Sequence, residues 1–135
     1  MLKKVGFVLV LLMALLQAFY ALFAFLDPVS FSNVRGTSLV SLEDTDWVQI
    51  YASRTLFVAL IVGFLLYLRN YKILSAAALF GVVMPVTDAW LAFQADAPSS
   101  VVIKHLITIV YLLCTAWVLY KIVREEEMIA SPSPN

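Results

Sequence analysis

Charged residues are scarce in this chain of 135 residues, where they make up only 13% of the sequence. A soluble domain usually carries about 25% charged residues. The nine basic and nine acidic residues balance to a net charge of zero, which leaves no case for a nucleic-acid-binding surface. This composition therefore argues against a soluble domain and against a nucleic-acid partner.

The residues that build common catalytic and metal centres are scarce as well. Cys114 is the one cysteine, so a disulfide within the chain is excluded. His105 is the one histidine, and a single imidazole with one or two carboxylates is a poor ligand set for a metal. The sequence has no nucleophile motif, no glycine-rich phosphate loop and no C-x-x-C pair. We therefore expect neither a metal nor a cofactor.

Long apolar runs dominate the chain instead, and hydrophobic residues make up 63% of it. At about 1.5 Å per residue, a helix of about 20 residues crosses a bilayer core of about 30 Å. The strands of a membrane barrel would be shorter and would alternate in polarity. The predicted membrane-spanning helices are residues 5–26, 47–68, 73–93 and 101–123.

The short connections between the later spans predict antiparallel neighbours. The fold class is therefore all-α, a membrane-embedded four-helix bundle with a long loop, residues 27–46, between the first two helices. This loop lies on the membrane surface or folds back over the bundle as a cap. We expect residues 1–124 to form one transmembrane domain, and residues 125–135, which are polar, to form a disordered tail.

The first apolar block follows two lysines, so a cleaved signal peptide is the alternative to a first span. The block exceeds the apolar core of about 7–15 residues of a secretory signal, which favours an uncleaved helix. Lys and Arg residues gather on one side of the predicted bundle, six against three, and the positive-inside rule then places both termini in the cytoplasm. The chain is predicted to be a multi-pass protein of the inner (plasma) membrane, with the 27–46 loop facing outward.

Each predicted span contains one strongly polar residue, namely Gln17, Arg54, Asp88 and His105. A charge deep in a spanning helix costs about 2.5–3.5 kcal/mol on insertion scales, so it needs a partner, water or a task. Their positions put all four about 6–13 Å below the outer boundary of the membrane. We therefore predict a polar pocket in the outer half of the membrane. Its candidate ligand-binding residues are Gln17, Tyr20, Tyr51, Arg54, Asp88, His105 and Thr108.

The centre of this pocket is predicted to be an ion pair between Arg54 and Asp88, with His105 beside it. The pair either fixes the register of the helices or forms a ligand or proton site. In a third interpretation, Arg54 extends outward to the membrane surface and does not meet Asp88. Pro85 lies one turn before Asp88 and is expected to kink the third helix.

Four short motifs carry a family resemblance: "LDPVSF" at the end of the first helix, "IYASRTLF" in the second, "MPVTDAW" in the third and "VIKHL" in the fourth. In these motifs the chain resembles small four-helix bacterial membrane proteins of the DoxX-like and related uncharacterised families. The resemblance covers nearly the entire chain. It implies the four-helix architecture and draws attention to Arg54, Asp88 and His105, but it implies no reaction.

The leading functional hypothesis is a non-catalytic membrane protein that binds a small or lipophilic ligand, or a membrane partner, through the pocket. One alternative is an enzyme that acts on a lipophilic substrate by acid–base chemistry, such as isomerisation or epoxide opening, with Asp88, His105 and Arg54 as its catalytic groups. The other alternative is a proton-linked carrier, which would need a homo-oligomer because four helices are few for a lone carrier. The lipid bilayer is an expected partner in every case.

Overall fold

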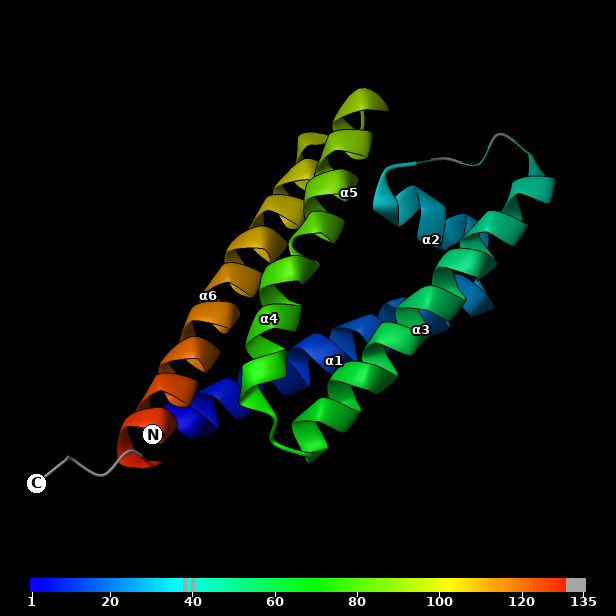
Figure 1. Ribbon diagram of the computed structural model, residues 1–135. Helices are drawn as coiled ribbons and strands as arrows, with labels where there is room; N and C mark the ends of the chain where they lie inside the picture. The colour runs from blue at the N-terminus through cyan, green and yellow to red at the C-terminus, as the bar shows by residue number, and fades with distance from the viewer. Residues whose placement is uncertain (38, 40, 131–135) are drawn as a thin grey trace, which may run out of the picture.

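The computed structural model of the protein describes residues 1–37, 39 and 41–130, and within these ranges it contains helices and no strands (Figure 1). The all-α prediction is therefore confirmed. The elements in chain order are α1 (Leu2–Leu26), α2 (Pro28–Arg35), the short 3₁₀ helix η1 (Leu42–Asp44), α3 (Thr45–Tyr67), α4 (Tyr71–Gly81), α5 (Val83–Gln94) and α6 (Ser99–Ala130).

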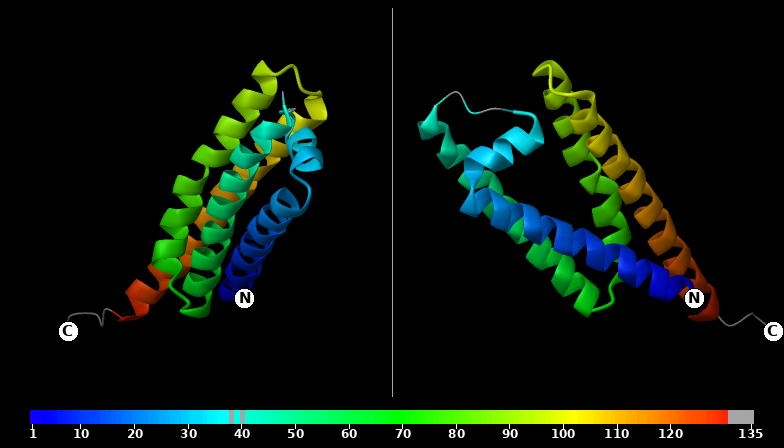
Figure 2. Two further views of the ribbon diagram at one scale, coloured as in Figure 1. Left: turned by 90° about the vertical axis from the view of Figure 1, so that its right-hand side faces the viewer. Right: turned by 180° about the vertical axis from the view of Figure 1, so that it is seen from behind.

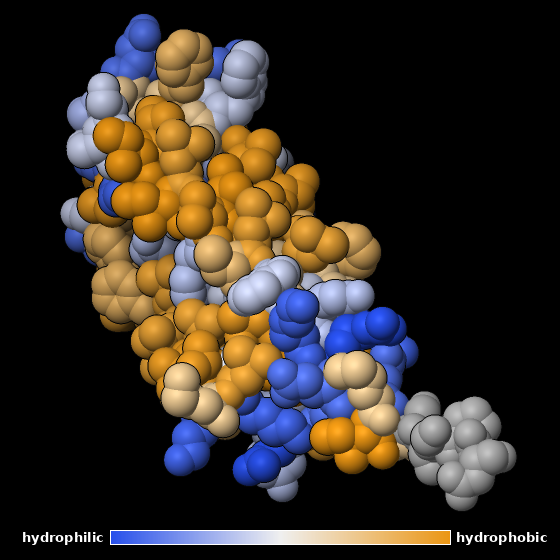
Figure 3. All heavy atoms as spheres, turned by 90° about the vertical axis from the view of Figure 1, so that its left-hand side faces the viewer, coloured by the Kyte–Doolittle hydropathy of each residue, from blue (hydrophilic) through white to orange (hydrophobic). Residues whose placement is uncertain are grey.

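Four helical segments of the described chain are long and apolar enough to cross a membrane: α1, α3, α4 with α5, and α6. Many large apolar side chains on them are exposed, including Phe57, Leu60 and Ile107. A soluble monomer rarely exposes apolar surface on this scale, whereas lipid would cover it. Figure 3 shows this apolar surface as a broad region between more polar ends. The chain thus has the features of a multi-pass membrane protein.

The helices form two antiparallel pairs rather than an evenly packed bundle. α1 packs along α3, and α6 packs along α4 and α5. The pairs meet at the end where both chain termini lie and diverge toward the other end, where α2 stands between them (Figures 1 and 2). We call these the closed end and the open end. The four helices thus lie as two pairs that are joined at one end, and neighbouring helices run antiparallel as expected.

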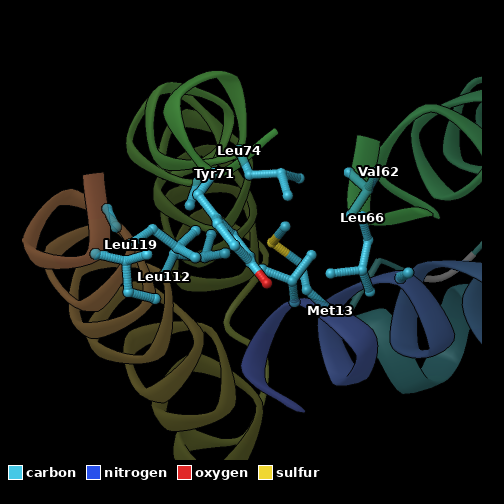
Figure 4. Close-up of a cluster of buried hydrophobic side chains, with 12 residues drawn as sticks. Met13, Val62, Leu66, Tyr71, Leu74, Leu112 and Leu119 are labelled. Carbon is cyan, nitrogen blue, oxygen red and sulfur yellow. The ribbon is translucent and has the colours of Figure 1, made fainter. Parts of the chain in front are cut away.

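A core of buried apolar side chains holds the closed end together. It draws on both pairs and includes Met13 from α1, Leu66 from α3, Leu74 from α4 and Leu119 from α6 (Figure 4). Burying a side chain of this size contributes about 1.5–3 kcal/mol in water, and in lipid the same contacts act through close packing. Ion pairs add to this end, such as Lys3 Nζ to Glu126 Oε1 at 2.7 Å.

The third predicted span is interrupted between α4 and α5, at Val82. Pro85 has no N–H to donate to the carbonyl of Gly81 four residues earlier, so the regular hydrogen-bond ladder stops there. The helix is therefore interrupted one turn before Pro85, and α5 continues along α6 toward the open end, where it carries Asp88.

Two segments differ from the expected organisation. Residues 125–130 continue α6 as helix, although their polar composition led us to expect a disordered tail, because ion pairs with α1 and α4 hold them; residues 131–135 of that tail lie outside the described part. The 27–46 loop folds back over the open end, which is one of its two predicted arrangements, and differs from the prediction in forming the helix α2 there. Phe31 of α2 is buried against α1 and α3 in a small second core with Ala24 and Ala52.

Candidate functional site

A cavity of about 300 Å³ lies between the two helix pairs at the open end. We call it the inter-pair cavity. α1 and α3 form one wall, α5 and α6 form the opposite wall, and the end of α2 contributes Val34 and Arg35. Most of the wall is apolar, as in a site for a lipophilic molecule. Its apolar lining includes Met13, Leu16 and Met84.

The charged centre of the cavity is an ion pair between Arg35 and Asp88, in which Arg35 NH2 donates to Asp88 Oδ2. The side chain of Arg35 is 14% exposed and that of Asp88 is 27% exposed. Both charges are thus largely removed from water, and each depends on the other. This contact joins α2, which packs on the α1–α3 pair, to α5 of the other pair.

The predicted ion pair of Asp88 with Arg54 is wrong. Arg54 is exposed and does not line the cavity, and the carboxylate is engaged by Arg35 instead. The buried stripe of α3 contains Ala52 and Thr55, and at about 100° per residue Arg54 lies about 200° from Ala52 around the helix. Since the pairs diverge at this end and α2 stands between them, α3 presents Tyr51 to Asp88 rather than an arginine.

Aromatic rings hold the Arg35 guanidinium in place from the other side. Its Cζ lies 5.6 Å from the ring centre of Tyr20, 5.9 Å from that of Phe31 and 5.6 Å from that of Tyr51. A guanidinium over aromatic faces at this range is attracted by about 0.5–2 kcal/mol per contact, depending on desolvation. The guanidinium of Arg35 thus contacts one carboxylate and three aromatic rings.

The local sequence explains why Arg35 stands there. Asp27 caps α2 by accepting a hydrogen bond from the Ser30 N–H at 3.0 Å, and hydrogen bonding by the Ser30 hydroxyl and N–H holds the pKa of the Asp27 carboxyl below its usual value. Pro28 opens the helix, and Gly36 ends it at a φ of +82°. A Cβ on Gly36 would lie 2.9 Å from Val101 Cγ1, so only glycine lets the helix end this close to α6.

His105 lies beside the ion pair on the first turns of α6. Its Nδ1 is 3.9 Å from Asp88 Oδ2, and the residue is only 5% exposed. Its Nε2 is buried and has no hydrogen-bond partner among the described residues. An unpaired buried imidazole nitrogen costs about 1–3 kcal/mol. His105 also lines the inter-pair cavity, although its Nε2 has almost no accessible surface there.

Of the seven residues predicted to bind a ligand, the structure brings six together around the inter-pair cavity and leaves Arg54 outside it. The six lining residues are Gln17, Tyr20, Tyr51, Asp88, His105 and Thr108.

The cavity is also lined by Arg35, Lys104 and Tyr111, which were not predicted to belong to it. For Arg35 a signal was present, because Asp27-Pro28 followed by Gly36 has the spacing of a capped eight-residue helix. Lys104 Nζ donates to the Val34 carbonyl at 3.0 Å, which ties α6 to the end of α2. Nothing in the sequence pattern indicates that contact.

A second cavity of about 330 Å³ lies on the other side of the ion pair. It shares Arg35, Tyr51 and Asp88 with the inter-pair cavity and reaches Asp44 and Trp47 near the start of α3. The ion pair therefore stands as a partition between two hollows. Across residues 1–37, 39 and 41–130, no cluster of three or more His, Cys, Asp or Glu side chains is arranged to hold a metal ion.

The model of one protein family, described as a domain of unknown function (DUF4267), matches residues 14–119. The match spans the inter-pair cavity and both helix pairs. Searches of curated proteins and of solved structures find no match to the chain.

Proposed function

We propose a function for the chain as a member of the DUF4267 family, to which it belongs because the family model covers residues 14–119. The chain is a membrane protein that binds a small lipophilic ligand in the inter-pair cavity. The resemblance to DoxX-like proteins stays a prediction, and the proposal does not depend on it.

The observation that carries the proposal is a largely apolar cavity of about 300 Å³ whose wall also contains Gln17, Asp88 and His105. An apolar ligand body would pack on Met13, Leu16 and Met84, and a polar group of the ligand would bond to the polar side chains of the wall. Sites for small lipophilic molecules commonly combine an apolar lining with a few polar groups in this way.

The test is whether lipophilic molecules copurify with the intact chain in mild detergent and are lost when the cavity is filled. Gln17→Trp places a large ring in the cavity. Phe19→Trp changes an exposed position of the same helix that lines neither cavity and serves as the matched control. We expect wild type and Phe19→Trp to retain a molecule near one per chain, as measured by native mass spectrometry, and Gln17→Trp to lose it. Equal retention by all three folded proteins would refute ligand binding in this cavity.

The position of Asp88 behind His105 also supports a second candidate function, acid–base catalysis on the bound molecule. A carboxylate near Nδ1 orients the imidazole of a residue that lines the cavity, and a rotation of the side chain would bring Nε2 to the bound molecule as a base. In this case Asp88→Asn would still bind the molecule but would no longer convert it. Mass spectrometry of the extracted ligand would detect this as a change from product to substrate.

We further propose that the closed end faces the cytoplasm in the inner membrane, with both termini inside. Six basic residues belong to that end and three to the open end. The six are Lys3, Lys4, Arg69, Lys72, Lys121 and Arg124, and the three are Arg35, Arg54 and Lys104. The inter-pair cavity would then lie in the outer half of the membrane.

A further inference from the structure

We infer that the ligand is a single-chain carboxylate, whose head lies at the open end of the inter-pair cavity and whose hydrocarbon chain points toward the closed end. This inference rests on the proposed function and adds to it the chemical class of the ligand and its orientation. The orientation follows from the order of apolar and polar residues along the wall. The head group follows from the charges and the hydrogen-bond donors at the polar end of that wall.

The wall of the inter-pair cavity changes from apolar to polar along the helices that form it. α1 and α5 run toward the open end, and α6 runs back from it (Figure 1). On each of these helices an apolar lining residue lies nearer the closed end and a polar one nearer the open end. These residues are Met13 and Tyr20 on α1, Val83 and Asp88 on α5, and Leu112 and Lys104 on α6. An amphiphile that matches this wall has its head at the open end.

The length of the wall indicates a chain of medium length. Lys104 and Leu112, which line the two ends of the cavity on α6, are separated by about 12 Å along the helix axis. The cavity volume of about 300 Å³ is at the small end of the range for ligand sites. We therefore choose decyl compounds as probes below.

Three polar side chains of the wall have no hydrogen-bond partner among the described residues, namely Gln17 and Tyr20 of α1 and Tyr51 of α3. All three residues are half-buried. Among the buried and half-buried side chains of the described chain, only His105 Nε2 is an unbonded nitrogen or oxygen without accessible surface. The Gln17 amide and the two tyrosine hydroxyls therefore keep accessible surface, and a molecule in the cavity can bond to them.

The charges of the wall favour an anion. Among the described lining residues, Arg35 and Lys104 are the lysine and arginine residues and Asp88 is the only carboxylate. Arg35 and Asp88 form an ion pair, so their charges offset each other. Lys104 forms no ion pair with a described residue, which leaves one positive charge uncompensated. Protonation of His105 would add to this positive charge and would not reverse its sign.

The ammonium of Lys104 is held beside the cavity and keeps donors for a ligand. Its Nζ donates to the Val34 carbonyl at 3.0 Å, at the end of α2. An ammonium has three N–H groups, so two remain. A carboxylate accepts hydrogen bonds from an ammonium, from hydroxyls and from an amide N–H at the same time, and the bond to a charged donor is about twice as strong as a neutral one. A carboxylate head therefore fits the donors and the charge of this wall better than an alcohol or a cation.

The test of the head group uses the full chain in phosphatidylcholine nanodiscs, with three probes of equal chain length: decanoate, decanol and decyltrimethylammonium. Binding is measured by titration calorimetry at a pH at which decanoate is ionised, and the signal from empty nanodiscs is subtracted. Decanoate is expected to bind at least about tenfold more tightly than decanol, and the cation more weakly than decanol. Decanol or the cation binding as tightly as decanoate would overturn the carboxylate assignment.

The role of Lys104 is tested by Lys104→Gln, which removes the charge and keeps an N–H donor, and by Lys104→Arg, which keeps the charge. Lys121→Gln is the control, because Lys121 is an exposed lysine of the same helix that lines neither cavity. The preference for decanoate over decanol is expected to fall at least about fivefold in Lys104→Gln and to persist in the other two variants. Decanol affinity should be the same in all of them. A preference that persists in Lys104→Gln would refute the placement of the head beside Lys104.

The orientation is tested on the native protein with a decanoate analogue that carries a diazirine at the end of its chain. Illumination of the complex should crosslink the apolar part of the wall, and mass spectrometry of the digested protein locates the crosslinks. Crosslinks confined to Tyr20, Tyr51 or Lys104 would refute the orientation. The expected sites are Met13, Val83, Met84 and Leu112.

The two proposals fail in distinguishable ways. If decanol binds as tightly as decanoate and Gln17→Trp abolishes the binding of both, cavity binding stands and the carboxylate class is wrong. If Gln17→Trp changes the binding of none of the three probes and no copurifying molecule depends on the cavity, the proposed function itself is wrong.

Discussion

Removing the guanidinium of Arg35 tests the central contact of the site. An exposed ion pair contributes about 0.2–1 kcal/mol, whereas removing one partner of a fully buried pair costs about 3–5 kcal/mol. The two side chains are 14% and 27% exposed, close to the buried limit, and Arg35 also loses its contacts with three aromatic rings. We therefore expect Arg35→Ala to lower the free energy of unfolding by about 3 kcal/mol.

The assay is equilibrium unfolding in mixed detergent micelles, with Arg35→Ala, Asp88→Ala and the double variant in one cycle. Each single variant leaves a poorly hydrated charge behind, so the double variant is expected to cost far less than the sum, with a coupling of about 2 kcal/mol. Arg54→Ala is the matched control, because Arg54 is exposed, and it should change stability by less than about 0.5 kcal/mol. Additive losses for Arg35 and Asp88, or an equal loss for Arg54, would refute the assignment.

Three further outcomes are expected. Gly36→Ala should destabilise the protein by at least about 1 kcal/mol in the same unfolding assay, because Gly36 has a positive φ and lies against α6. Gly63→Ala is the control and should be tolerated, because an added Cβ would have no neighbour within 4 Å. Equal effects of the two substitutions would contradict this geometry. The pKa of the Asp27 carboxyl is lower in the folded protein than in the unfolded chain. The ionised carboxylate therefore stabilises α2 fully at any pH above the pKa of the unfolded chain, and this stabilisation is lost as the pH falls through the pKa of the folded protein. Amide exchange of α2 should show this loss in wild type but not in Asp27→Asn. In a Cys114→Ser background, Ser41→Cys should react with an impermeant maleimide added outside intact cells, and reaction only after lysis would reverse the proposed orientation.

The sequence was sufficient to predict most of the membrane architecture. Apolar runs of about 20 residues determine helices in lipid almost by length alone, because every backbone polar group must be bonded within its own segment. The interruption at Pro85 was also readable, since a missing N–H has a local effect. By contrast, the divergence of the two pairs depends on contacts between distant segments, such as Leu66 with Met13 and Leu74, and no periodicity in the chain encodes it.

Most of the predicted lining residues of the candidate site lie at the cavity, but the predicted cationic partner of Asp88 was wrong. Gln17, Asp88 and His105 could be placed at a common depth because rise per residue fixes depth in a spanning helix. Rotation around the helix is harder to assign, and Arg54 was placed on the wrong face of α3. Arg35 was overlooked because it lies in a connecting segment, where depth in the membrane cannot be counted from the end of a span.

The separation of the closed end from the open end divides two tasks between different residues. Met13, Leu66, Leu74 and Leu119 pack at the end where the pairs join, and His105, Asp88 and Arg35 gather where they part. Substitutions at the open end can therefore alter what the cavity accepts while the packed core continues to specify the fold. A protein divided in this way can change its ligand over evolution without first acquiring a new source of stability.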